Sequence, residues 1–194
     1  MFKGKTMNQK DCIVLGIDPG LDRTGWAILR KDARAGLHLV ACGLIHTEAG
    51  QDLPVRLNYI FQEFQKLLNT YRPDQVAMEQ NFFLKRAITM ANTIMTRGVI
   101  ILACEQAGKT ITFYPPKRVK MQLCGSGAAD KKQVQRMVQL TLNLDKAPSP
   151  DDVADAVAIA ICHLKTAPLN SMINVKAAFL AKLKAAQEAQ IKKR

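Results

Sequence analysis

The chain has 194 residues, 48% of them hydrophobic and 23% charged, a balance that is typical of a globular protein and excludes a disordered one. No uncharged apolar run approaches the roughly 20 residues that a membrane helix needs, so we expect no association with a membrane. The first eleven residues lack the apolar stretch of a secretory signal, and the five scattered cysteines form no C-x-x-C pair. We therefore expect a cytoplasmic protein whose cysteines are thiols.

The charge of the chain is strongly positive and unevenly distributed. Twenty-eight Lys and Arg against sixteen Asp and Glu give a formal net charge of +12. Residues 109–136 contain seven basic side chains and one acid, and residues 165–194 have the same numbers. Basic segments of this kind are typical of proteins that bind a nucleic-acid backbone, although a merely solubilising surface is the alternative.

Three short apolar runs open the chain and predict strands over residues 12–17, 24–29 and 37–46. Their close succession predicts an antiparallel meander. From Leu53 the apolar residues recur at helical spacing, which predicts a helix that ends before Tyr71. A fourth strand over residues 75–78 leads into Glu79.

The second half of the chain alternates between helices and turns. We predict helices over residues 85–106, 131–144 and 151–164, with a fifth strand over residues 110–114 that Pro115 and Pro116 terminate. This order of elements predicts an α/β fold, a mixed five-stranded sheet with helices on both faces. We expect an N-terminal extension over residues 1–11, one domain over residues 12–165 and a basic C-terminal tail of helical composition over residues 166–194.

Four acidic residues occur at positions that such a sheet would bring together. Asp18 follows the first strand and Glu79 ends the fourth, and ligands of α/β proteins bind beyond strand ends. Asp152 and Asp155 share one face of an otherwise apolar helix, where buried carboxylates need a compensating cation. Four carboxylates are a hard-oxygen ligand set for two Mg²⁺ ions, with Mn²⁺ as a substitute, and two such ions promote phosphodiester hydrolysis.

Each of these acids also has a structural explanation. Asp18 precedes Pro19 and could belong to a turn, while Glu79 could be a surface acid. Asp151 and Asp152 could cap the helix that follows them. The basic segments make it less plausible that all of the acids are structural.

Several motifs, in order and at near-constant spacing over residues 13–163, resemble the RuvC family of Holliday junction resolvases. They are Leu15-Gly16-Ile17-Asp18-Pro19-Gly20 with Thr24-Gly25, Met78-Glu79-Gln80 with Phe82, Arg97-Gly98-Val99, Arg118-Val119-Lys120, the segment 125–135, and the segment 152–160. The resemblance implies an RNase H-like fold and a homodimer. It implies paired, Mg²⁺-dependent cleavage of four-way DNA junctions in recombination and repair, leaving 5′-phosphate and 3′-hydroxyl ends.

The resemblance also implies roles for single residues. It assigns a metal-binding and catalytic acidic tetrad to Asp18, Glu79, Asp152 and Asp155. Asp151 stays an alternative for the third acid, because some members of the family have a histidine there, whereas the Asp-x-x-Asp-Ala spacing favours Asp152.

DNA contacts follow from the same resemblance. Phe82 matches an aromatic residue that stacks on a base near the crossover, and Phe83 is either a second wedge or a core residue. Lys120 and Lys131 match basic residues that support DNA binding or catalysis. We assign phosphate contacts to three further residues, Lys117, Arg118 and Lys132.

Other readings of the sequence remain. Residues 16–25 also resemble the phosphate loop of actin-like ATPases and sugar kinases, but those proteins need two domains around a cleft. A junction-binding module without cleavage, or an RNase H-like nuclease acting on another nucleic acid, is the alternative function. The resemblance makes a branch-migration helicase complex of the RuvA and RuvB type a candidate partner. We expect His163 to be structural, since two helical turns separate it from Asp155.

Overall fold

The computed structural model describes residues 11–32, 36–80 and 87–166, without the side chains of residues 87–89. Its contacts divide the chain into two compact units, Met1–His163 and Leu164–Arg194. The first unit contains β1 (Cys12–Asp18), β2 (Arg23–Asp32), β3 (Gly36–His46), α1 (Leu53–Tyr71), β4 (Gln75–Glu79), α2 (Ala87–Gln106), β5 (Ile111–Tyr114), α3 (Pro116–Cys124) and α4 (Lys131–Thr141). A final helix covers residues 151–166 and is called the 151–166 helix below.

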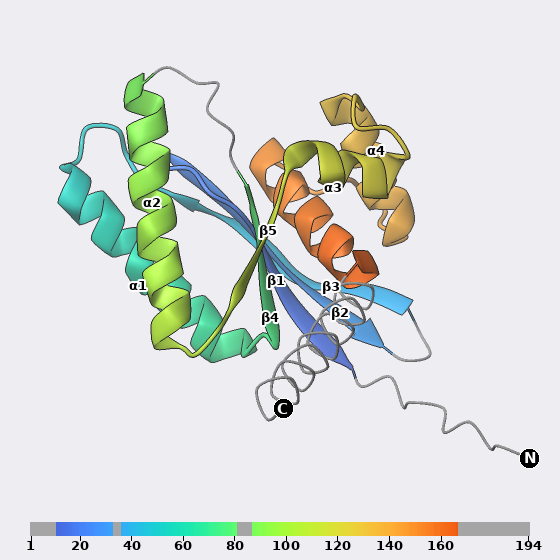
Figure 1. Cartoon of the computed structure of the whole chain (residues 1–194), viewed down its shortest axis with the longest axis horizontal. Helices are drawn as coiled ribbons and strands as arrows, with labels where there is room; N and C mark the ends of the chain where they lie inside the picture. The colour runs from blue at the N-terminus through green and yellow to red at the C-terminus, as the bar shows by residue number, and fades with distance from the viewer. Residues whose placement is uncertain (1–10, 33–35, 81–86, 167–194) are drawn as a thin grey trace, which may run out of the picture. The chain divides into compact units, whose positions relative to one another are not determined.

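The five strands form one mixed sheet in the order β3-β2-β1-β4-β5 (Figure 1). The pairs β1–β2 and β2–β3 are antiparallel, while β1–β4 and β4–β5 are parallel. This confirms the predicted five-stranded sheet with its antiparallel edge. Because Ile17 pairs with Met78, the carboxyl ends of β1 and β4 lie next to each other.

Helices cover both faces of this sheet, as predicted. Alternate residues of β1, such as Leu15 and Ile17, are fully buried in a core shared with Phe64 of α1 and Ile100 of α2. Figure 1 shows α1 and α2 together on one side of the sheet and the 151–166 helix with α3 and α4 on the other. The alternation follows from the two-residue period of a strand.

Two glycines let the 151–166 helix touch the opposite face of the sheet. A Cβ atom at Gly16 would lie 2.3 Å from the carbonyl oxygen of Ala156, and one at Gly25 would lie 1.9 Å from that of Asp152. Both positions exclude any side chain unless the helix moves. The helix that carries Asp152 and Asp155 is therefore positioned by backbone contact with β1 and β2.

The strand β5 ends before Pro115 as predicted, but the helix that follows it was not predicted. Residues 116–124 form α3, because Pro116 occupies the first turn of a helix, where it costs no hydrogen bond. Gly125 ends α3 in the left-handed conformation at φ 74°. The following helix, α4, ends at Thr141 rather than at residue 144, and Asp130 caps it together with Gln133.

Two of the predicted segments fall largely outside the described residues. The N-terminal extension up to residue 10 and residues 167–194 of the expected tail are outside the described part of the chain. Across the described ranges, every helix falls short of the length and apolarity needed to cross a membrane.

Candidate active site

Three of the four predicted acids line one hollow. Asp18 ends β1, Glu79 ends β4, and Asp152 joins them from the first turn of the 151–166 helix. The hollow has a volume of about 300 Å³ and is also lined by the turn over residues 19–22 and by Asn92 and Thr93 of α2. We call it the first hollow.

A second hollow of about 230 Å³ contains the fourth acid, Asp155. Glu79 lines it as well, so the two hollows meet at this side chain. Lys120 of α3 and Lys131 of α4 also line the second hollow, and the rest of its wall is apolar. Carboxylates and ammonium groups are thus combined in one recess beyond the strand ends.

The donor set fits hard divalent cations, although it is not a closed cage. Among the residues that the structure describes, no three His, Cys, Asp or Glu side chains converge closely enough to hold one metal ion. Mg²⁺ characteristically binds through one or two carboxylates and completes its shell with water and substrate phosphates. Acids distributed over two joined hollows match this mode of binding.

The pKa of Asp155 is raised by its burial and by the acids around it. Burial, and after it the neighbouring charges of Asp18, Asp151 and Asp152, raise the pKa of its carboxyl from 3.8 to about 6, although Lys131 lowers it. Carboxylates held together in this way are relieved by a bound cation. The electrostatics therefore agree with the metal chemistry expected of the four acids.

Asp151 and Asp152 point to different surroundings. Asp152 lines the first hollow, where Arg23 pairs with it at 2.5 Å between Nη2 and Oδ2. Asp151 instead accepts a hydrogen bond of 2.7 Å from Gln135 and lies 3.4 Å from the ammonium of Lys131. Asp151 therefore links α4 to the 151–166 helix, and this placement favours Asp152 as the third acid.

A buried arginine, Arg56 of α1, supports the turn that follows Asp18. Its guanidinium contacts Asp22, and its Nε donates a hydrogen bond of 2.8 Å to Thr47, which in turn donates one of 2.7 Å to the carbonyl of Leu21. Sequence reasoning missed this residue. The sequence does contain a signal for it: Arg56 lies four residues before Ile60, so helical spacing places it on the buried face of α1.

Arg97 of α2 fixes the end of β4. Its Nη1 donates a hydrogen bond to the backbone carbonyl of Glu79, and its guanidinium lies 5.3 Å from the centre of the Phe113 ring. The sequence analysis included Arg97 in a family motif but did not predict its contact with Glu79. The contact holds Glu79 where the two hollows meet.

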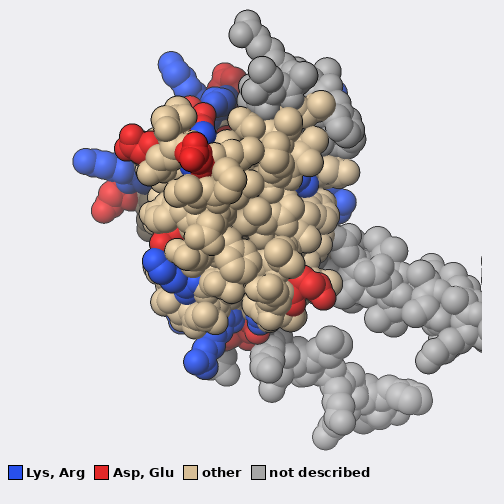
Figure 2. Space-filling model, turned by 90° about the vertical axis from the view of Figure 1, so that its left-hand side faces the viewer, with Lys and Arg blue, Asp and Glu red and all other residues tan. Residues whose placement is uncertain are grey.

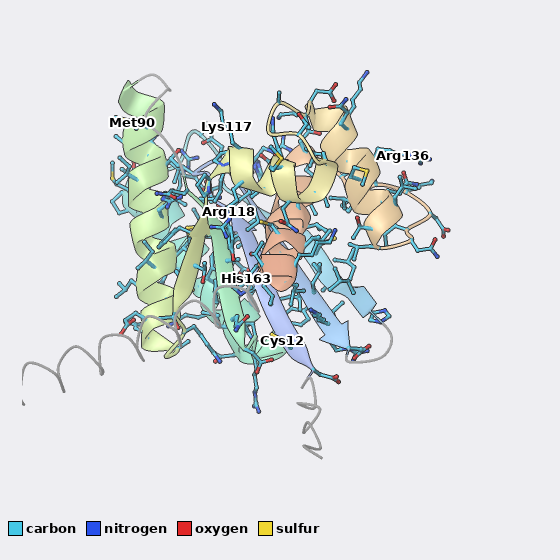
Figure 3. All side chains as sticks on the ribbon, turned by 45° about the vertical axis from the view of Figure 1, so that its right-hand side comes forward. Cys12, Met90, Lys117, Arg118, Arg136 and His163 are labelled. Carbon is cyan, nitrogen blue, oxygen red and sulfur yellow. The ribbon has the colours of Figure 1, made fainter. Side chains whose placement is uncertain are left out.

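The predicted DNA contacts fall into separate groups. Lys120 and Lys131 line the second hollow beside the acids. Lys117 is exposed on α3, while Arg118 lies 5.4 Å from the Tyr114 ring (Figure 3). Lys132 lines a different hollow, next to Arg136 of α4. Phe82 and Phe83 lie outside the described residues.

His163 is buried and takes part in a structural network. Its Nδ1 lies 3.0 Å from the hydroxyl of Tyr114, and its Nε2 lies 2.7 Å from Oε1 of Gln75. Burial lowers the pKa of the imidazole to about 4, so the ring is neutral. An Nε2–H that donates to Gln75 and an Nδ1 that accepts from Tyr114 account for both contacts, in agreement with the expected structural role.

Comparison with known sequences finds one consistent set of relatives. The family described as "Crossover junction endodeoxyribonuclease RuvC" matches residues 14–163, a range that includes all four acids. A protein of that name from Brevibacillus brevis is 47% identical over 150 residues, which are 77% of this chain and 90% of the relative. Another from Syntrophomonas wolfei is 43% identical over 164 residues, 84% of this chain and 95% of the relative.

Solved structures show the same likeness in three dimensions. Thermus thermophilus RuvC superposes with a TM-score of 0.76 at 31% identity, over 81% of this chain and 96% of that chain. The same protein in complex with Holliday junction substrate gives a TM-score of 0.78 at 30% identity, over 82% of this chain and 96% of that chain. A yeast mitochondrial Holliday junction resolvase, Ydc2, shares the fold at 16% identity and a TM-score of 0.63.

Proposed function

The chain belongs to the RuvC family of crossover junction endodeoxyribonucleases, and we propose from this membership that its two acidic hollows are the site at which it resolves Holliday junctions. The observation that carries the proposal is that acids from β1, β4 and the 151–166 helix meet beyond the strand ends. The structural likeness to T. thermophilus RuvC in complex with Holliday junction substrate supports it.

We infer that Asp18, Glu79, Asp152 and Asp155 hold the divalent cations on which nucleases of this family depend. The oxygen-only donor set, and a carboxyl at Asp155 whose ionisation is disfavoured by burial and then by neighbouring acids, favour two Mg²⁺ ions, with Mn²⁺ as a substitute. When bound by these four acids, such ions would supply a nucleophilic water and stabilise the leaving oxygen of an in-line displacement, which would leave 5′-phosphate and 3′-hydroxyl ends.

The protein side chains provide position and charge for this reaction. Arg97 holds the backbone at Glu79, and Arg56 supports the turn that follows Asp18. Lys120 and Lys131 attract a phosphate into the second hollow and offset the negative charge that develops there. Each of these groups acts on the placement or stabilisation of the scissile phosphate.

Binding of the junction involves more of the surface. We propose phosphate contacts for Lys117 and Lys132, which are exposed on α3 and α4. Arg118 is a weaker candidate, because its guanidinium packs over Tyr114. Base stacking by Phe82, with Phe83 as a second wedge, stays a prediction, as does a partner of the RuvA and RuvB type.

We also propose that the protein acts as a homodimer through α2. Ile94 and Leu102 are each 52% exposed on this helix, and Met95 and Ile101 are each 40% exposed. Figure 2 views the α1 and α2 side of the molecule and shows a broad uncharged area with charges gathered at its margins. An apolar surface of this kind marks an interface, and a two-fold dimer would present two hollows to two opposing DNA strands.

Replacing Leu102 by Glu should break this dimer, because a charge would have to be buried in the interface. We expect light scattering to report a monomer for Leu102→Glu and a dimer for the wild type. Leu140→Glu is the matched control, since Leu140 on α4 is 55% exposed and outside the proposed interface. Loss of the dimer in both variants, or in neither, would contradict the assignment to α2.

The substrate class is tested by comparing nucleic acids under one set of conditions. We expect Mg²⁺-dependent, symmetrically paired cuts in a synthetic four-way junction and no cuts in linear duplex DNA or an RNA–DNA hybrid. Cleavage of the hybrid would show that the substrate is another nucleic acid, and binding without cleavage would show that the protein is a junction-binding module.

We place this reaction in the cytoplasm, which is supported by five cysteines that are all thiols.

A further inference from the structure

Arg23 is a cation that already occupies the acidic site. It is the first residue of β2, and its Nη2 lies 2.5 Å from Oδ2 of Asp152. The two side chains line the first hollow together with Asp18 and Glu79. They are 46% and 29% exposed, so the pair faces the space that a substrate would enter rather than the core.

The backbone of Arg23 is fixed, whereas its side chain is not enclosed. Thr24 donates a hydrogen bond of 2.6 Å to the carbonyl of Gly20, and a Cβ at Gly20 would lie 2.5 Å from the carbonyl oxygen of Arg23. In the antiparallel ladder of β2 and β3, the backbone of Arg23 lies opposite that of His46. Movement of the guanidinium therefore needs only changes of side-chain rotamer within the open hollow.

A divalent cation and this guanidinium compete for the same carboxylate. Mg²⁺ coordinates carboxylate oxygens at about 2.0–2.1 Å. Arg23 already occupies Oδ2 of Asp152, and two positive groups close to one oxygen repel each other. Binding of an ion at Oδ2 therefore displaces the guanidinium or is weakened by it.

Once displaced, the guanidinium remains in the hollow that must receive a phosphate. Its planar fork of N–H donors matches two phosphate oxygens better than an ammonium does. The other nearby ion pairs have different roles: the buried Arg56 contacts the exposed Asp22 of the turn, and Lys131 with Asp151 connects two helices.

We propose that Arg23 is a resident counter-ion that holds Asp152 in the metal-free protein, yields it to the divalent cation and then binds a phosphate of the DNA strand. The proposal rests on the assignment of Asp152 as a metal ligand made above. One consequence is that DNA and metal bind cooperatively, since a bound cation releases Arg23 for the phosphate, and the coupling is reciprocal.

The first test measures binding of Mn²⁺ to the DNA-free protein by calorimetry. Arg23→Gln removes the competitor and should bind Mn²⁺ about three to ten times more tightly than the wild type, the range expected for an exposed ion pair and one nearby charge. Arg30→Gln is the matched control. Arg30 lies on the same strand, is 47% exposed and pairs with Asp32 at 3.2 Å, so its loss changes the net charge equally.

The second test asks where the guanidinium goes. In a cleavage-inactive Asp155→Asn background, at a Mg²⁺ concentration that calorimetry shows to saturate this variant, Arg23→Gln should lower the salt dependence of junction binding by about one phosphate contact. With EDTA in place of Mg²⁺ the same substitution should leave that slope unchanged, because Arg23 then stays on Asp152. Arg30→Gln should show no difference between the two conditions.

The outcomes separate this proposal from the metal site on which it rests. Equal Mn²⁺ affinities for Arg23→Gln and Arg30→Gln would overturn the role of Arg23, provided that Asp152→Asn weakens binding. An unchanged affinity in Asp152→Asn would instead show that Asp152 is not a ligand, and the metal-site assignment would fail. If Arg23→Gln lowers the salt dependence of junction binding equally with Mg²⁺ and with EDTA, the proposed transfer of Arg23 to a phosphate is overturned.

Discussion

Replacing Gly25 by Ala should both destabilise the protein and reduce cleavage about a hundredfold. The added methyl group would lie 1.9 Å from the carbonyl oxygen of Asp152 and 2.4 Å from its carbonyl carbon, so the 151–166 helix must move away from β2. Overpacking of this kind costs about 1–3 kcal/mol, and a shift of about 1 Å in catalytic groups commonly costs a hundredfold in rate.

Urea unfolding and junction cleavage measure the two effects on the same variant. Gly50→Ala is the matched control, because a Cβ at Gly50 meets no atom within 4 Å. We expect the control to match the wild type in both assays. A Gly25→Ala protein with wild-type stability and cleavage would show that contact with β2 does not position the acids.

Replacing Asp155 by Asn should stabilise the metal-free protein while abolishing cleavage. The pKa of Asp155 is raised from 3.8 to about 6, mainly by burial, so ionising it in the folded state is unfavourable. About two pKa units at 1.36 kcal/mol each correspond to about 3 kcal/mol, less some screening by solvent. The function of the site and the stability of the fold are thus in conflict at this residue.

The sign of this effect depends on pH. Below about pH 4 the carboxyl is protonated in the folded and the unfolded chain, and the substitution should change little. Between about pH 4 and pH 6 only the unfolded chain ionises, so wild-type stability falls as the pH rises. Above pH 6 the penalty is fully present, and Asp155→Asn should gain most there.

Unfolding in urea with EDTA at pH 4 and at pH 8 measures this difference directly. Asp145→Asn serves as the control, since Asp145 is exposed in a loop outside both hollows. Saturating Mg²⁺ should narrow the gap by stabilising the wild type more than the variant. An Asp155→Asn protein less stable than the wild type at pH 8 in EDTA would contradict the electrostatic account.

The sheet and most of its helices could be predicted because local patterns determine them. The apolar run of β1 and the helical spacing from Leu53 onwards are visible without tertiary information. The strand-end positions of Asp18 and Glu79 followed from where the first and fourth apolar runs end. The helix α3 could not be predicted in this way, because a proline ends one element and begins the next with equal ease.

The interactions around the acids could not be predicted, because they depend on contacts between distant elements. Arg23 meets Asp152 only when β2 packs against the 151–166 helix, and Arg97 meets Glu79 only across α2 and β4. The choice between Asp151 and Asp152 turns on a rotation of about 100° per residue along one helix. Sequence spacing favoured Asp152, and the hollow that this residue lines now supports that choice.

The central claim is that the joined hollows cleave a four-way junction by using their carboxylates. The most direct measurement compares wild type and Asp18→Asn for binding and for cleavage of an end-labelled junction, with Mg²⁺ and with EDTA. We predict that both proteins bind the junction with similar affinity and that only the wild type, with Mg²⁺, makes paired cuts. Undiminished cleavage by Asp18→Asn, or by the wild type in EDTA, would contradict the account.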